Sequence, residues 1–203
     1  MRTFWDDRYR QEEYAYGTSP NVYFASRLAA LTPGKLLLAA EGEGRNAVHA
    51  ARCGWETHAF DQSSFGKEKA LRLAEANGVT IHYEVQDCLA SRYPDHFFDA
   101  IGLIYAHFPA MIKSDCHRYL KAFLRPGGTI IFEAFSKKHP AYQAQYPHIG
   151  GPTEVPMLFS CEEIREDFQD FDILELTETE TELSEGRFHV GKGSVIRFTG
   201  IKK

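Results

Sequence analysis

An acidic, glycine-rich segment with the potential for ligand chemistry occupies residues 41–47 (Glu-Gly-Glu-Gly-Arg-Asn-Ala), between an apolar run and an alanine-rich stretch. Small residues let the backbone approach a ligand closely, and the start of a following helix offers free amides. Asp61 ends the next apolar run, where its carboxylate could accept hydrogen bonds from a ribose diol. The pattern predicts a nucleotide-like ligand, with Glu41, Gly42, Gly44, Asn46 and Asp61 as candidate contacts.

Two other interpretations of this turn stay open. The glycines could simply make a tight connection from a strand to a helix. The spacing Gly42-x-Gly44-x-x-Ala47 also satisfies the dinucleotide fingerprint of an NAD(P)-dependent oxidoreductase. Glu41 and Glu43 argue against that second interpretation, because they would repel a pyrophosphate but tolerate a cationic sulfonium and an α-amino group.

The elements that must position these residues alternate between strands and helices. Apolar or alternating runs predict strands near residues 35–40, 56–60, 79–85, 97–104, 129–135, 173–183 and 190–201. Helical spacing and caps predict helices over 45–53, from Ser63 or Ser64 to residue 77, over 112–123, and from the capping box that begins at Ser160. The alternation predicts an α/β, Rossmann-like, doubly wound sheet of about seven strands, with ligands at the carboxyl ends of its strands. The last two predicted strands lack a helix between them, so they form a hairpin with one strand antiparallel to the rest.

Several motifs in this order resemble the class I S-adenosylmethionine-dependent methyltransferases, in particular their branch similar to tellurite-resistance and thiopurine methyltransferases. The resemblance spans nearly the whole chain. It is carried by residues 5–9 (Trp-Asp-Asp-Arg-Tyr), 16–21 (Tyr-Gly-Thr-Ser-Pro-Asn), 42–47, 61–63 (Asp-Gln-Ser), 98–101 (Phe-Asp-Ala-Ile) and 124–128 (Leu-Arg-Pro-Gly-Gly). The family usually has an acidic residue just before its glycine turn. Here those positions are Leu38 and Ala40, so Glu41 is expected to take the acidic role.

The resemblance implies cofactor contacts residue by residue. It implies that Asp61, followed by Gln62, binds the ribose. It also implies that Asp87 and Cys88, flanked by Gln86 and Leu89, contact the adenine, and that the segment from Tyr16 to Asn21 covers the cofactor. Two other roles are open: Asp87 could cap a turn, and Cys88 is expected to act as a small hydrophobic residue rather than as a reactive thiol.

A candidate catalytic rim follows the fourth predicted strand. His107 is the candidate catalytic residue, as a base with an unperturbed pKa or as a group that orients the acceptor, although it could equally bind a neighbouring loop. Tyr105 could line the methionine end of the cofactor or simply pack. Arg187 and His189, between the last two strands, and His148, in the long loop after the fifth, are candidate substrate contacts or solvated loop residues.

Composition limits the partners and the compartment. The chain has 203 residues and a net charge of −5, and residues 162–185 hold eleven acidic residues against the single basic Arg165, so we expect no nucleic-acid partner. The four cysteines are dispersed and no apolar stretch is long enough for a membrane span, which predicts a cytoplasmic protein without a metal site. We expect one domain over 1–203, with an N-terminal helical cap (1–31) and a Rossmann-like core (32–203), as a monomer or homodimer.

The predicted function is methyl transfer from S-adenosyl-L-methionine to a small-molecule substrate, with S-adenosyl-L-homocysteine as the product. The transfer would proceed in line onto the acceptor. A non-catalytic S-adenosylmethionine-binding or metalloid-resistance protein is a third alternative, beside the oxidoreductase.

Overall fold

A seven-stranded mixed sheet forms the centre of the molecule, in the order β3-β2-β1-β4-β5-β7-β6. The computed structural model describes residues 2–203; Met1, the first residue of the predicted cap, lies outside the described residues. The strands are β1 (Lys35–Ala39), β2 (Glu56–Asp61), β3 (His82–Val85), β4 (Phe98–Ile104), β5 (Leu124–Phe135), β6 (Phe171–Glu185) and β7 (His189–Lys202). Strands β1 to β5 pair in parallel, whereas β7 is antiparallel to both β5 and β6. The predicted fold class is confirmed.

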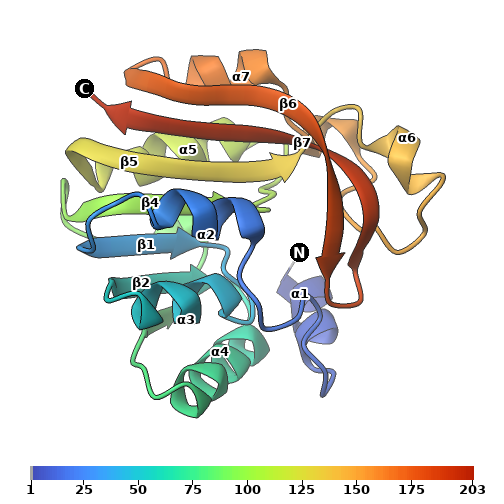
Figure 1. Cartoon of the computed structure of the whole chain (residues 1–203), viewed down its shortest axis with the longest axis horizontal. Helices are drawn as coiled ribbons and strands as arrows, with labels where there is room; N and C mark the ends of the chain where they lie inside the picture. The colour runs from blue at the N-terminus through green and yellow to red at the C-terminus, as the bar shows by residue number, and fades with distance from the viewer. Residues whose placement is uncertain (1) are drawn as a thin grey trace.

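Helices cover both faces of this sheet. They are α1 (Arg2–Tyr9), α2 (Val22–Leu28), α3 (Arg45–Arg52), α4 (Ser64–Ala76), α5 (Lys113–Ala122), α6 (Pro140–Gln143) and α7 (Cys161–Asp167), with short 3-10 turns η1 (Cys88–Ala90) and η2 (Val155–Met157). Figure 1 shows α2, α3 and α4 in front of the strands and α5 and α7 behind them. Within the described residues, no helix is both long enough and apolar enough to cross a membrane.

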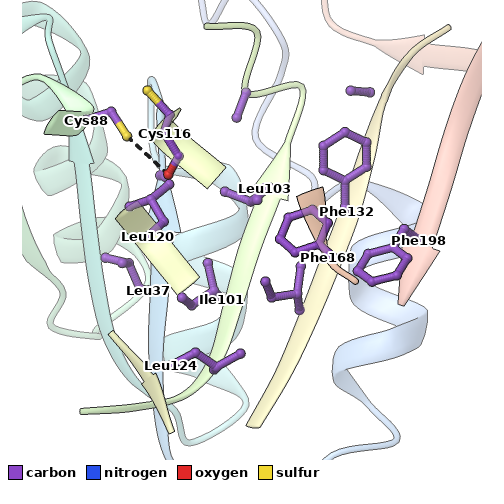
Figure 2. Close-up of a cluster of buried hydrophobic side chains, with 14 of the residues drawn as sticks. Leu37, Cys88, Ile101, Leu103, Cys116, Leu120, Leu124, Phe132, Phe168 and Phe198 are labelled. Atoms are coloured by element: carbon purple, nitrogen blue, oxygen red, sulfur yellow. Dashed lines mark hydrogen bonds between the residues drawn. The ribbon is translucent and has the colours of Figure 1, made fainter. Parts of the chain in front are cut away.

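Apolar side chains on the two sheet faces form two main clusters. Figure 2 shows part of the cluster behind the sheet, where Phe132 of β5 and Phe198 of β7 meet Phe168 at the end of α7. The cluster on the other face holds α2, α3 and α4 against the strands. Gly102 allows α2 to approach, because a Cβ there would lie 2.4 Å from Leu38 Cδ2 and 3.2 Å from the ring of Phe24. Residues of β1, β2 and β4 belong to these two clusters, so the strands that lead to the candidate site are packed on both faces.

Most predicted element ends agree with the structure because they depend on local capping. Ser160 and Glu163 form the predicted capping box. Strand β3 begins at His82 rather than Val79, because the amide of Val79 is used at the end of α4, on Ala74 O. Strand β5 begins at Leu124 rather than at Thr129, and its pairing with β4 is irregular around the Pro-Gly-Gly segment that precedes the predicted strand.

The β6–β7 hairpin is longer than predicted and extends past the end of β5. Pairing between β5 and β7 ends at Phe135 and Val195, whereas β6 and β7 remain paired as far as Glu185 and His189. The two hairpin strands satisfy each other's hydrogen bonds, so they can continue beyond the sheet. Figure 1 shows the hairpin tip beside α1, and the amide of Arg187 donates to Ala15 O at 2.9 Å.

Candidate functional site

The candidate site lies where the carboxyl ends of the parallel strands meet the hairpin tip. Strand β1 lies between β2 and β4, and the chain leaves β1 toward β2 but leaves β4 toward β5. Such a reversal of strand order opens the crevice in which α/β folds bind ligands. The glycine turn after β1 and Asp61 at the end of β2 both belong to this edge.

Glu41 is buried and turns back onto the helix that follows it. Its Oε1 atom accepts the amides of Asn46 and Ala47, both at 2.8 Å. Burial of the carboxyl raises its pKa to about 7, against the opposing effect of these hydrogen bonds. The expectation that the first amides of this helix are free for a ligand is therefore wrong for Asn46 and Ala47, since Glu41 occupies them.

Gly42 and Gly44 both have left-handed backbone angles, with φ of 63° and 85°. A Cβ on Gly44 would lie 2.5 Å from the Cβ of Ala70, so Gly44 is required for α3 to pack on α4. A Cβ on Gly42 would lie 2.6 Å from the hydroxyl of Tyr9. Gly42 is therefore required for the side chain of Tyr9 to pack against the turn.

Asp61 stands beside the turn, as the sequence predicted. Its carboxylate accepts the amide of Gly42 at 3.2 Å and that of Ser63 at 2.9 Å. Burial raises the pKa of Asp61 to about 6, although these amides oppose the shift. At neutral pH the group is mostly an ionised carboxylate under the cover of α1, where Asp6 accepts a hydrogen bond from Ser63 Oγ at 2.6 Å.

Glu43 is committed to a structural ion pair. Lys69 Nζ lies 2.6 Å from Glu43 Oε1, with both side chains buried, and Glu43 Oε2 accepts the amide of Ala15 at 2.7 Å. The pair ties the N-terminal segment to α4. Because Lys69 neutralises Glu43, this residue no longer supports the charge argument against a bound pyrophosphate.

The residues expected near the adenine are only partly brought together. The amide of Gln86 donates to Asp61 O at 2.9 Å, and Gln62 is half-buried beside it. Asp87 and Leu89 are exposed. The Cys88 thiol instead points into the core toward Cys116 O, at 4.0 Å (Figure 2). Its contact with Cys116 and its burial raise the pKa of Cys88, which agrees with a small hydrophobic role.

His189, near the hairpin tip, contacts two other predicted site residues, Tyr16 and Tyr105. His189 Nδ1 lies 3.0 Å from Glu185 Oε2, and Arg45 donates to the same carboxylate at 2.9 Å. Burial opposes ionisation of Glu185, but the hydrogen bond from His189 and the charge of Arg45 lower its pKa to about 2. The ring centroids of Tyr16 and Tyr105 each lie 4.5 Å from that of His189. Tyr16, Tyr105 and His189 thus form one cluster that is continuous with the glycine turn.

Glu133 is the main site residue that the sequence interpretation missed. It is buried in β5, where it accepts Asn21 Nδ2 at 2.7 Å, Tyr105 Oη at 3.1 Å and Arg197 Nε at 2.6 Å. Asn21 continues the network, because its Nδ2 also lies 3.0 Å from Glu185 Oε1 and its backbone amide donates to Asn46 Oδ1 at 2.9 Å. A single carboxylate within the apolar run 129–135 was the available signal, since a buried charge requires partners.

His107 lies on this side of the sheet but is enclosed in protein contacts. Nδ1 lies 3.1 Å from Met157 O, and Nε2 accepts the amide of Phe135 at 3.4 Å. Desolvation lowers the pKa of His107 to about 3, against the favourable contact with Met157. The expected unperturbed pKa is therefore wrong, because both ring nitrogens are used in a desolvated setting.

The two remaining candidate substrate residues face solvent. Arg187 pairs with Glu13 at 2.8 Å, with both side chains more than half exposed. His148 is exposed, and only its backbone oxygen contacts the hairpin, through the amide of Val190 at 3.0 Å. The long loop after β5 therefore lies beside the hairpin, as the topology predicted, but neither side chain joins the cluster around Tyr16.

Part of the chain matches a known domain family. Residues 37–128, which include the glycine turn and Asp61, match the family model described as a methyltransferase domain. No curated protein matches the sequence.

Several solved structures share this architecture. One, described under the conversion of a disulfide bond into a thioacetal group during echinomycin biosynthesis, is 19% identical and covers 100% of this chain and 92% of its own, with a TM-score of 0.81. TehB from Haemophilus influenzae is 17% identical over 100% of this chain and 67% of its own, with a TM-score of 0.74. Magnesium protoporphyrin IX methyltransferase from Synechocystis PCC 6803, with bound SAH, is 16% identical over 100% and 97%, with a TM-score of 0.72. At these identities the likeness establishes the α/β methyltransferase fold.

Proposed function

We propose that this protein is a methyltransferase that uses S-adenosyl-L-methionine as its cofactor and acts on a small-molecule acceptor. The observation that carries the proposal is the contact of the Asp61 carboxylate with the amide of Gly42, 3.2 Å apart, inside the segment that matches the methyltransferase domain. A carboxylate beside a glycine turn can accept hydrogen bonds from the ribose hydroxyls of a nucleoside ligand, while the turn lets the ligand approach the backbone.

The residues present fit this cofactor. Asp61 is ionised at neutral pH and can accept two ribose hydroxyls, and Gly42 has no side chain to obstruct the turn. When bound, S-adenosylmethionine supplies a methyl group already activated on a cationic sulfonium. Tyr9 packs against Gly42, so we expect α1 to shift when the cofactor enters.

The chain itself then orients the reactants and excludes water. Glu133, Asn21 and Glu185 link β5, the start of α2 and the hairpin into one buried network, which fixes the walls of the site. Tyr16 and His189 lie against one another at its mouth. Orientation of this kind contributes up to about 7–11 kcal/mol in favourable cases.

The acceptor enters as an anion, because the histidines at the site are poor proton acceptors. Burial lowers the pKa of His107 to about 3 and also lowers that of His189. A thiolate or a soft chalcogen anion needs no base for methyl transfer. The sulfur chemistry named for one structural neighbour, the likeness to TehB and the motifs shared with the tellurite and thiopurine branch support this acceptor class. His107, whose two ring nitrogens contact Met157 O and the amide of Phe135, would then support the wall of the acceptor site rather than deprotonate the acceptor.

The proposal extends to the partners. A small soluble acceptor, no nucleic acid or membrane partner, a monomer or homodimer and a cytoplasmic location all agree with the acidic net charge and the dispersed cysteines. These expectations are open to direct measurement.

Calorimetry with S-adenosylhomocysteine tests the cofactor. We expect saturable binding that Asp61→Asn weakens by about 1–3 kcal/mol, through loss of ribose hydrogen bonds. Asp95→Asn, at an exposed loop residue, is the matched control and should bind like the wild type. Absence of binding by the folded wild-type protein would overturn the proposal, and measurable binding of NAD or NADP would favour the oxidoreductase.

A turnover assay separates an enzyme from a non-catalytic binding protein. Labelled S-adenosylmethionine is incubated with a panel of small thiols, selenols, oxyanions, amines and phenols, and methylated products are identified by mass spectrometry. We expect label on a thiol or heavier chalcogen. Label on an amine or phenol alone would contradict the anionic acceptor, and cofactor binding without label on any compound would favour the sensor.

A further inference from the structure

We propose that Glu56, His58 and His82, on β2 and the edge strand β3, form a binding site for a borderline transition-metal ion such as Zn²⁺. Glu56 and His58 belong to β2, and His82 belongs to the edge strand β3. No metal-binding spacing is visible in the sequence, because the two histidines are 24 positions apart and meet through strand pairing. The inference is independent of the methyltransferase proposal.

The three potential ligands converge. His58 and His82 are direct partners in the parallel β2–β3 register, and their rings stack with centroids 4.5 Å apart and an interplanar angle of 23°. His58 Nε2 lies 3.1 Å from Glu56 Oε1. One ligand atom from each of the three residues lies within 4.8 Å of the other two.

These separations suit a tetrahedral ion. Zinc binds imidazole nitrogen and carboxylate oxygen at about 2.0–2.2 Å, so two ligands of one tetrahedral ion lie roughly 3.3–3.5 Å apart. The separation of His58 from Glu56 is already close to that value. Glu56 and His82 are exposed, so small rotations of their side chains can bring all three ligand atoms to an ion.

His58 is held in place before any ion arrives. The rings of Tyr93, Phe97 and Phe98 lie edge-on to its imidazole, with centroids 5.4 to 6.0 Å away. A ligand with few available rotamers loses less conformational entropy when it binds. His58 therefore acts as the fixed ligand, and the two exposed residues complete the site around it.

The surroundings leave room for a fourth ligand. Glu84, which follows His82 on the same strand face, lines the same pocket with Gln86 and Arg92. Arg92 is a competing positive charge, but its Nη1 donates to Ser91 O and to Tyr119 Oη, at 2.8 and 2.7 Å. The other nearby cation, Lys35, lies with Nζ 4.8 Å from the centre of the Phe97 ring.

An ion at this site would cross-link β2 to the edge strand β3. Strand β3 has four residues and pairs with β2 alone. The expected consequence is a zinc-dependent gain in the stability of the β2–β3 edge.

Calorimetry on untagged, chelator-treated full-length protein tests the site. We expect one Zn²⁺ to bind, a rise in melting temperature with Zn²⁺, and affinity at least about tenfold lower in His82→Ala. Binding also weakens in Glu56→Gln, an exposed substitution that serves if His82→Ala is unstable. Co²⁺ should give visible absorption bands without thiolate charge transfer.

The control must exclude another metal-binding pair. His49 Nε2 and Cys53 Sγ lie 3.7 Å apart on α3 and could also capture zinc. Cys53→Ser should therefore leave the affinity for Zn²⁺ unchanged. Absence of saturable binding, wild-type affinity in both His82→Ala and Glu56→Gln, or loss of binding in Cys53→Ser would each overturn the proposal.

Discussion

The hydroxyl of Tyr9 lies so close to Gly42 that a Cβ on that glycine would be 2.6 Å from it. Tyr9 belongs to α1 and is buried, and Gly42 belongs to the turn after β1. The N-terminal helix thus covers the turn that we propose as the cofactor site. We therefore expect cofactor binding to be coupled to a movement of α1.

That coupling predicts a fluorescence change. The ring of Trp5 stacks on Tyr9 with centroids 5.5 Å apart, whereas Trp55 is buried in the core. Titration with S-adenosylhomocysteine should change the emission of Trp5 with the same dissociation constant as calorimetry, and Trp5→Phe should abolish the change. Binding by calorimetry with no change in wild-type emission would show that α1 stays in place.

Stability should depend on pH through Glu41. Burial raises the pKa of this carboxyl in the folded protein to about 7, so its contribution is present below the unfolded value of 4.5 and is lost as pH rises through 7. The difference between the two values corresponds to a loss of about 3 kcal/mol from pH 4.5 to 8.

Glu41→Gln isolates this effect, because the amide oxygen can still accept the amides of Asn46 and Ala47. Urea denaturation of both proteins at pH 5 and pH 8 measures it. The free energy of unfolding should fall less with pH in the variant than in the wild type. Equal slopes would show that Glu41 is ionised in the folded protein at pH 5.

The pH dependence of turnover should not report His107. With a pKa of about 3, its imidazole stays neutral across pH 5.5 to 9. His107→Gln should therefore change mainly KM, and the profile of kcat/KM should keep the inflection set by the acceptor's own ionisation. A wild-type inflection near pH 6.5 that disappears in the variant would restore His107 as a general base.

Removal of the charge on Glu133 should be costly. This buried carboxylate accepts Arg197 Nε at 2.6 Å, and Glu133→Gln keeps an acceptor oxygen but removes the charge that neutralises the guanidinium. Because Arg197 is partly exposed, the expected loss is about 1–3 kcal/mol in the free energy of unfolding. Arg197→Met should rescue part of it in the double variant, and strictly additive losses would mean that the two residues are not coupled.

The sequence alone determined the order of elements, the glycine turn and Asp61 at the end of β2. These features depend on neighbours in the chain: the capping box at Ser160, the glycine after each early helix, and the alternation in residues 177–182 that became part of β6. Strand and helix alternation restricts the topology to few solutions, which is why the mostly parallel sheet and its antiparallel C-terminal strand were predictable.

Tertiary structure decided which polar groups remain available. Glu41 uses the helix amides that the sequence offered to a ligand, and desolvation removes His107 from the range of a physiological base. Glu133 meets Asn21, 112 positions away, and His58 meets His82 through strand register. The burial and the direction of a side chain depend on neighbours that are distant in the sequence. No local pattern in residues 41–47, at His107 or along β2 could therefore have determined them.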